Sequence, residues 1–164
     1  MRTLLSLLLL VGISSTASAQ TIQRIDVTEV GIFRTETTAV EAAPGTATGR
    51  VQKVINRKLV RATTTIPARL GVNFGIQYDI VGRAGASATL KVVWLIPQPG
   101  IRNPKTGNTT VRDVFDRSSI VGSTNNFSGF SFTHAWEIVT GTWAVEIWDG
   151  NRKLASQSFN VVTP

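Results

Sequence analysis

The chain has 164 residues, of which 42% are hydrophobic and 16% charged, and its formal net charge at pH 7 is +7. This composition excludes a disordered chain, which needs low hydrophobicity and high net charge, and a long coiled coil, which is rich in Glu, Lys and Leu. Because the chain has no cysteine, disulfides, thiolate zinc sites, iron–sulfur clusters and cysteine nucleophiles are excluded as well.

Residues 1–19 have the three parts of a secretory signal peptide. Arg2 supplies the positive charge, Leu4 to Ile13 are apolar, and Ala17-Ser18-Ala19 is a small-x-small cleavage site. The apolar stretch is about half the roughly 20 residues that a spanning helix needs. We therefore expect an exported protein, periplasmic or extracellular, with no transmembrane segment and with residues 20–164 as one mature domain.

The first half of the mature chain contains sequence patterns typical of strands. Residues 22–33, 48–55 and 58–66 are rich in Val, Ile and Thr. From Leu70 to Ile80 every even residue is large and apolar, which is the period of a half-buried strand. The same pattern continues on even residues from Ala88 to Ile96 after a glycine-containing turn, so the two segments predict an antiparallel hairpin.

The second half alternates between irregular segments and strands. Residues 97–110 hold three prolines and residues 118–129 are mostly Ser, Asn and Gly, so both are predicted to be long loops. Residues 105–115 are expected to hold a short helical turn at most. Strands are expected at 130–136 and in a C-terminal hairpin, whose arms are 142–148 and 152–162 and whose turn is the Asp149-Gly150-Asn151 segment.

Seven to nine short strands without a convincing helix predict an all-β, single-domain, two-sheet antiparallel sandwich. An up-and-down barrel is the alternative. Trp94 and Trp143 lie in apolar rows and are expected in the core, together with Phe159 and Val161.

Three segments carry a family resemblance. They are Ile66–Gly71, Pro99–Pro104 and the ending Gly141–Gly150, which is followed by Arg152–Ala155 and Phe159. The ending is similar to the last hairpin of many bacterial immunoglobulin-like domains. Together, in this order, the segments resemble an exported bacterial family catalogued as domain of unknown function 3859. The resemblance implies an immunoglobulin-like sandwich and an exported location, and it implies no activity and no catalytic residues.

Catalytic sites are not supported by the pattern. His134 is the only histidine, and a lone imidazole in an alternating row lacks the partners of a Ser-His-Asp site, so a half-buried structural role is favoured. Three acids, Glu137, Glu146 and Asp149, are the candidates for paired carboxylates of a glycoside hydrolase. Glu146 is expected on a solvated face and Asp149 in a turn. We therefore predict no catalytic, metal-binding or cofactor-binding residues and no cofactor.

A basic run lies in the segment 50–61, where five cations occur without an acid. Arg57, Lys58 and Arg61 are the candidate contacts for an anionic envelope component, such as lipopolysaccharide or an acidic glycan. The alternative is that they prevent edge-to-edge pairing of an edge strand. Nucleic acid is disfavoured by the export signal and by the lack of interleaved aromatic residues.

Two further features are candidate partner contacts. The proline-rich loop 97–110 presents Ile101 as a lone apolar residue near the cations Arg102 and Lys105. The alternative is that Ile101 folds back onto the core. Trp148 lies on the polar face of its strand and either binds a sugar or protein partner or covers the open end of the sandwich.

From the sequence we expect a non-enzymatic binding or accessory module of the bacterial cell envelope, with an unknown protein or an anionic envelope component as partner. The first alternative is a small carbohydrate-active hydrolase that uses paired carboxylates. The second is a periplasmic inhibitor or chaperone-like protein that presents a loop or an open edge strand. The oligomeric state does not follow from the sequence.

Overall fold

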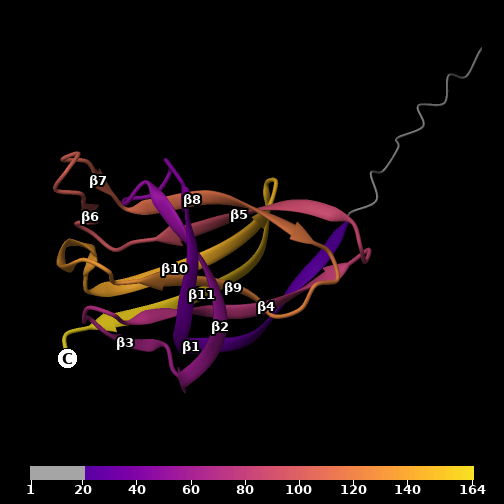
Figure 1. The fold of residues 1–164 in the computed structure, drawn as a ribbon, viewed down its shortest axis with the longest axis horizontal. Coiled ribbons are helices and arrows are strands. Elements are labelled where there is room, and N and C mark those ends of the chain that lie inside the picture. The colour runs from indigo at the N-terminus through magenta and orange to yellow at the C-terminus, as the bar shows by residue number, and fades with distance from the viewer. Residues whose placement is uncertain (1–20) are drawn as a thin grey trace, which may run out of the picture.

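The computed structural model describes residues 21–164, and the predicted signal peptide lies outside them. Strands and one 3-10 helix, η1, make up the described fold (Figure 1). In chain order the elements are β1 (Ile22–Ala42), β2 (Arg50–Ala62), β3 (Thr65–Pro67), β4 (Asn73–Gly82), β5 (Ser87–Leu95), β6 (Ile101–Arg102), β7 (Thr109–Thr110), β8 (Arg112–Ile120), β9 (Asn126–Ser131), η1 (Ala135–Glu137), β10 (Gly141–Asp149) and β11 (Arg152–Val162). Within residues 21–164, no helix has the length and apolar character needed to cross a membrane.

Two sheets form the sandwich. The first has the strand order β2-β1-β4-β9 and the second has the order β3-β11-β10-β5-β8, while β6 and β7 form a separate two-stranded ladder. Neighbouring strands are antiparallel, except that β3 runs parallel to β11. The predicted single-domain, all-β sandwich of two sheets is thereby confirmed.

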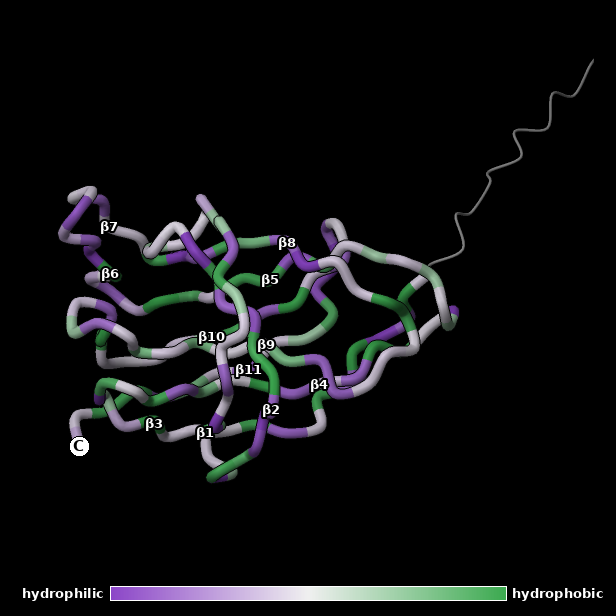
Figure 2. Tube along the Cα trace, in the orientation of Figure 1, coloured by the Kyte–Doolittle hydropathy of each residue, from purple (hydrophilic) through white to green (hydrophobic). Residues whose placement is uncertain are grey.

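The core between the sheets is rich in aromatic rings. Phe74 of β4 meets Trp94 of β5 and Trp143 of β10 edge-on, with ring centroids 5.5 and 5.9 Å apart. Both tryptophans are buried as predicted, and the Trp143 indole N–H donates a 2.7 Å hydrogen bond to the carbonyl oxygen of Val139. Figure 2 shows hydrophobic stretches along the strands that enclose this core and a hydrophilic β6–β7 end.

The predicted hairpin between residues 70–80 and 88–96 is wrong. β4 pairs with β1 and β9, whereas β5 pairs with β8 and β10, so the connection between β4 and β5 crosses from one sheet to the other. Buried side chains such as Ile76 and Val92 therefore belong to opposite sheets that share one core. An alternating pattern shows that one face of a strand is buried, but it does not show whether the next strand lies beside it or opposite it.

The C-terminal hairpin of β10 and β11 is confirmed. Its register pairs Trp143 with Phe159 and Asp149 with Arg152. Gly150 in the turn has φ 57°, a conformation that glycine adopts without steric cost. Because the two strands are joined by a tight turn, local sequence signals are sufficient to predict their pairing.

Upstream, the two strands predicted at 48–55 and 58–66 are mostly one strand, β2, which is followed by the short β3. Asn56 lies in the middle of β2 with φ 51°, a left-handed conformation that asparagine tolerates. The register between β1 and β2 also shifts near this residue. A bulge therefore joins two segments that the sequence pattern separates.

The region from 97 to 120 contains more strand than predicted. The loop 97–110 includes the β6–β7 ladder. In the segment 105–115, where a short helical turn at most was expected, one turn is closed by the Gly107 N–H, which donates to the Asn103 carbonyl oxygen, and β8 begins at Arg112. β8 is an edge strand. An edge strand has a neighbouring strand on one side only and can carry many polar residues, so its sequence resembles that of a loop.

In the next segment, the observed loop and the observed strand are both shorter than predicted. Of the loop expected at 118–129, only residues 121–125 lie between β8 and β9. The strand expected at 130–136 ends at Ser131, and the chain turns into η1. Glu137 causes this ending, since its buried carboxylate accepts hydrogen bonds from the backbone N–H groups of Thr133 and His134 at 2.6 and 2.7 Å.

Candidate binding groove under the β1–β2 arm

β1 is much longer than the sheet to which it belongs. Residues 22–32 pair with β4, and residues 31–42 pair with β2. Beyond Phe33 the β1–β2 hairpin therefore leaves the first sheet, and Figure 1 shows it running across the other strands. We call residues 35–56 the arm and residues 43–49 the arm tip.

Three hydrogen bonds of 2.8 Å hold the arm tip, two of them to β8 and one to Asn103 between β6 and β7. The Val114 N–H donates to the Gly45 carbonyl oxygen, the Ala47 N–H donates to Asp113 Oδ1, and Asn103 Nδ2 donates to the Ala47 carbonyl oxygen. A Cβ on residue 45 would lie only 2.4 Å from the Val114 carbonyl oxygen, so this close approach requires glycine. The tip is thus held by specific contacts to the second sheet.

Arg57 attaches the base of the arm to the first sheet. Its guanidinium donates a 2.7 Å hydrogen bond to the carbonyl oxygen of Asn125 and lies 6.0 Å from the centre of the Phe127 ring. The arm is therefore connected to both sheets, at β8 through its tip and at the start of β9 through Arg57. For Arg57, a candidate partner contact, this is an internal structural role.

A groove of about 840 Å³ lies beneath the arm. Its walls come from the arm and from β8 and β9, which are edge strands of opposite sheets. Inward-facing side chains of β8 differ from an ordinary core row because they are mostly polar. The lining includes Asn73, Trp94, Asp113, Phe115, Ser119 and Phe130.

Three buried side-chain atoms of this lining have no hydrogen-bond partner among the described residues. They are the indole N–H of Trp94, Oδ1 of Asn73 and Oγ of Ser119. Buried polar atoms are nearly always paired, and an unpaired one costs about 1–3 kcal/mol. Together they are a donor, an acceptor and a hydroxyl that is both, which matches a ligand with hydroxyl or amide groups. All three atoms are shielded from solvent in this conformation, so neighbouring side chains must move for a ligand to reach them.

Asp113 is the buried acid of the groove. Burial raises the pKa of its carboxyl to about 6; the Ala47 N–H lowers this pKa in part, and the charge of Glu137 raises it further. Asp113 therefore changes protonation near neutral pH while it holds the arm tip.

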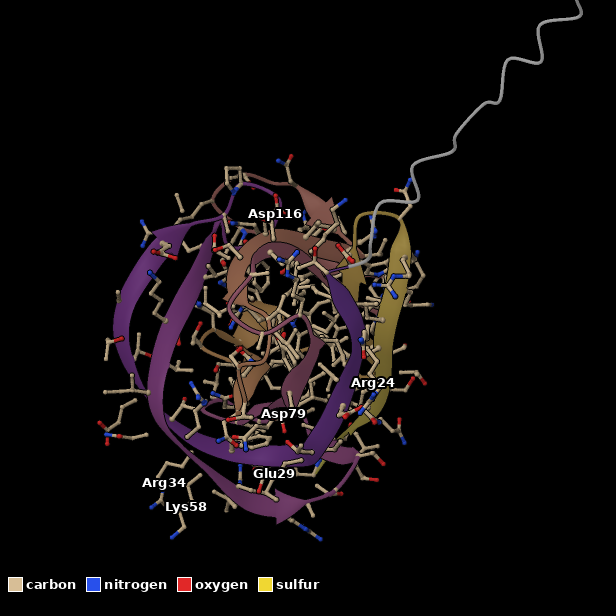
Figure 3. All side chains as sticks on the ribbon, turned by 90° about the vertical axis from the view of Figure 1, so that its right-hand side faces the viewer. Arg24, Glu29, Arg34, Lys58, Asp79 and Asp116 are labelled. Carbon is tan, nitrogen blue, oxygen red and sulfur yellow. The ribbon has the colours of Figure 1, made fainter. Side chains whose placement is uncertain are left out.

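The other two basic candidates lie away from the groove lining. Lys58 and Arg61 are exposed, and Lys58 is the cross-strand partner of Arg34. Figure 3 shows Arg34 and Lys58 on the outer side of the β1–β2 hairpin, at the base of the arm, pointing away from the rest of the chain. β2 is an edge strand, so the topology agrees with the edge-protection alternative for these cations.

In the proline-rich loop, the interpretation of Ile101 as an exposed anchor is wrong. Ile101 has no exposed surface and belongs to the core, because β6 turns its side chain inward. Arg102 and Lys105 are exposed as expected. The residue of this loop that approaches the arm is Asn103.

Trp148 is half-buried and contacts its own neighbours. Its indole N–H donates a 2.9 Å hydrogen bond to Glu146, and Lys153 Nζ lies 5.4 Å from its ring centre. Glu146 is buried, contrary to the predicted solvated face. Burial alone would raise the pKa of Glu146, but hydrogen bonds from Lys153 and Trp148 lower it below its ordinary value.

The candidate acid–base residues have internal partners. Asp149 pairs with Arg152 at 3.1 Å, and Glu137 caps η1. His134, predicted to be half-buried at a sheet edge, precedes η1 with 59% of its side chain exposed and stacks on Trp136. Among residues 21–164, no three His, Asp or Glu side chains gather in a way that suits a metal ion.

Sequence reasoning missed the residues that make the groove. Asp113, Phe115, Arg117 and Ser119 alternate along β8, and this period-two pattern with polar inward residues was the available signal. The pattern is hard to recognise because the expected helical turn at 105–115 and the expected loop at 118–129 cover most of β8.

A comparison with curated proteins gives no match. Among solved structures, the chain is similar to an immunoglobulin-like protein from Pseudomonas aeruginosa, with 24% identity, a TM-score of 0.58 and coverage of 87% of this chain and 100% of that chain. A β-glucosidase from Listeria innocua in complex with glucose matches with 8% identity, a TM-score of 0.34 and coverage of 80% of this chain and 16% of that chain. The first likeness confirms the predicted immunoglobulin-like fold.

The sequence profile described as Domain of unknown function (DUF3859) matches residues 21–161. This match covers nearly all of the described sandwich, the arm and the groove included. It agrees with the family that the three sequence segments resemble. The chain belongs to the DUF3859 family.

Proposed function

We propose that the protein is an exported, non-enzymatic binding module of the bacterial cell envelope, and that it holds its ligand in the groove beneath the arm. The observation that carries the proposal is the set of unpaired buried atoms of Asn73, Trp94 and Ser119 in the groove lining. A ligand that pairs with these atoms removes a cost that the free protein bears. Export follows from the signal peptide predicted at residues 1–19.

The test compares the mature protein with an arm-deleted variant. Arg34 and Lys58 are cross-strand partners, so an Asn-Gly turn in place of the arm and Arg57 (residues 35–57) closes the shortened hairpin with a favoured turn. A control variant, Arg102→Ser with Lys105→Ser, changes an exposed loop and keeps the arm. Each protein is immobilised and exposed to envelope extract from the source bacterium, and bound molecules are quantified by mass spectrometry.

We expect the mature protein and the loop control to retain the same molecules and the arm-deleted variant to lose them. Circular dichroism and a thermal melt check that the arm-deleted variant is folded. Equal retention by all three proteins contradicts a ligand beneath the arm, and so does the absence of any specifically retained molecule.

A carbohydrate-active hydrolase is the second candidate, and one observation favours it. Asp113, with a raised pKa, and Glu137 both line the groove, and a protonated acid next to a second carboxylate is what glycoside hydrolysis needs. Both carboxylates, however, already accept hydrogen bonds from backbone N–H groups, which favours a structural role for them. Turnover of nitrophenyl glycosides that is lost in both Asp113→Asn and Glu137→Gln would establish the hydrolase and overturn the binding module.

A further inference from the structure

The two main sheets have four edge strands, and three of them have features that prevent pairing with another chain. β2 shifts register with β1 and carries Arg57, Lys58 and Arg61. β3 has three residues and ends in Pro67. β9 has six residues, and the carbonyl oxygen of Phe127 accepts a 2.6 Å hydrogen bond from Arg117. Charges, proline, irregular register and shortness are the usual ways to protect an edge.

β8 is the exception within the described sheets. It has nine residues without a proline, and its register with β5 runs without a shift from Arg112 to Ile120. Of its four charged residues, Arg112 and Asp116 are exposed and, by the alternation of the strand, lie on the outer face of the sheet. Asp113 and Arg117 lie on the inner face, where both are engaged within the chain, Asp113 by the Ala47 N–H and Arg117 by the Phe127 carbonyl oxygen. Such a regular edge is a template for another strand unless something covers it.

Alternate residues of β8 direct their backbone N–H and C=O groups away from β5, toward the open edge of the sheet. The Val114 N–H bonds to Gly45 of the arm tip, so in an antiparallel ladder the N–H and C=O groups of Asp116 and Ser118 point the same way. Both residues line the groove. The arm tip thus occupies the outward backbone N–H of Val114. The outward backbone groups of the next two such residues, Asp116 and Ser118, remain accessible from the groove.

Charge also indicates what kind of molecule fits. Lys53 and Glu41 of the arm pair with each other at 2.6 Å, and Arg57 and Arg117 donate to backbone carbonyl oxygens. The acids Asp113 and Glu137 accept backbone N–H groups. These charges are engaged within the chain, and the two other charged lining residues, Arg50 and Asp116, are exposed. The buried part of the groove is therefore complementary to an uncharged backbone with small or hydroxyl-bearing side chains.

We infer that the groove binds an extended, uncharged segment of another polypeptide, which adds as a strand to the β8 edge at Asp116 and Ser118 beneath the arm. This inference rests on the proposed function and names its ligand class. The segment spans residues 115–119 of β8, which corresponds to about 17 Å of extended chain. Main-chain hydrogen bonds to β8 supply affinity, and alternate side chains meet Phe115, Ser119 and the unpaired groups of the groove.

The experiment uses a phage-displayed library of random twelve-residue peptides on the immobilised mature protein. Enriched peptides are synthesised, and their affinities are measured by calorimetry for the mature protein, for Ser118→Pro and for Ser131→Pro. Proline removes an outward N–H, and an edge strand tolerates this when that N–H faces solvent. Ser131 lies on the opposite wall of the groove, so Ser131→Pro is the matched control. Asp116→Pro is the second variant if Ser118→Pro does not fold.

We expect Ser118→Pro to weaken peptide binding about tenfold or more, as the loss of a buried hydrogen bond does, and Ser131→Pro to bind as the mature protein does. N-methylation of alternate peptide residues is expected to abolish binding. Hydrogen exchange of the Asp116 and Ser118 amides is expected to slow in the complex.

Other outcomes overturn strand addition. Peptides that need the arm but bind Ser118→Pro normally contradict it and leave the groove, and with it the proposed function, in place. Oligosaccharides that bind in an arm-dependent way, with no enriched peptide, have the same consequence. If neither class binds and arm deletion does not change what the protein retains from envelope extract, both the inference and the proposed function fail.

Discussion

Asp113 makes the stability of the fold depend on pH in an unusual direction. The buried carboxyl holds the Ala47 N–H at the arm tip, and burial raises its pKa from 3.8 to about 6. Because the folded chain holds this proton more tightly than the unfolded chain, protonation of Asp113 stabilises the fold. Most paired carboxylates have the opposite effect. We expect the contribution to be fully present below about pH 4 and to be lost as the pH rises through 6.

The magnitude follows from the two pKa values. At about 1.4 kcal/mol per pH unit, the interval between 3.8 and about 6 corresponds to about 3 kcal/mol of unfolding free energy. Asp113→Asn keeps an oxygen that accepts the Ala47 N–H but cannot ionise. It is therefore expected to remove this part of the pH dependence and to be at least as stable as the unmodified protein at pH 7.

Urea unfolding followed by tryptophan fluorescence measures the difference. The mature protein and Asp113→Asn are unfolded at half-unit steps from pH 4 to pH 8, and the two curves of unfolding free energy are subtracted. Because charges distant from the substitution contribute equally in both proteins, the difference reports Asp113 together with its coupling to Glu137. A difference that does not change between pH 4 and pH 7, or that changes with the opposite sign, would refute a buried, proton-binding Asp113.

Three further predictions concern the core, the arm and the N-terminus. Ile101→Ala is expected to lower the unfolding free energy by about 2–5 kcal/mol because the side chain is fully buried; an unchanged urea midpoint would contradict a core role. Neutralising Lys58 and Arg61 is expected to shift heparin elution no more than neutralising Arg69 and Arg83, since edge protection involves no specific anion site; a clearly larger shift would restore the anionic partner. Intact-mass measurement of the exported protein is expected to show a chain that begins at Gln20, whereas full-length protein in the membrane fraction would exclude cleavage.

The fold class followed from the sequence because it depends on local periodicity. Period-two alternation in the segments 70–80 and 142–162 predicted strands, and apolar rows predicted that Trp94 and Trp143 are buried. The C-terminal hairpin was also predictable, since its turn signal and its pairing strands are adjacent. Each of these properties is decided by interactions within about twenty residues.

The groove did not follow from the sequence because it is made by contacts between distant segments. Asp113 receives the Ala47 N–H across 66 positions of the chain, and no local pattern indicates that pairing. The placement of β4 and β5 in opposite sheets has the same cause, since alternation reveals a buried face but not the strand that buries it. Composition and periodicity therefore determined that this chain is a sandwich with an apolar core. Only the tertiary structure decided which edges meet, because the partner of an edge strand is chosen by packing across the whole fold.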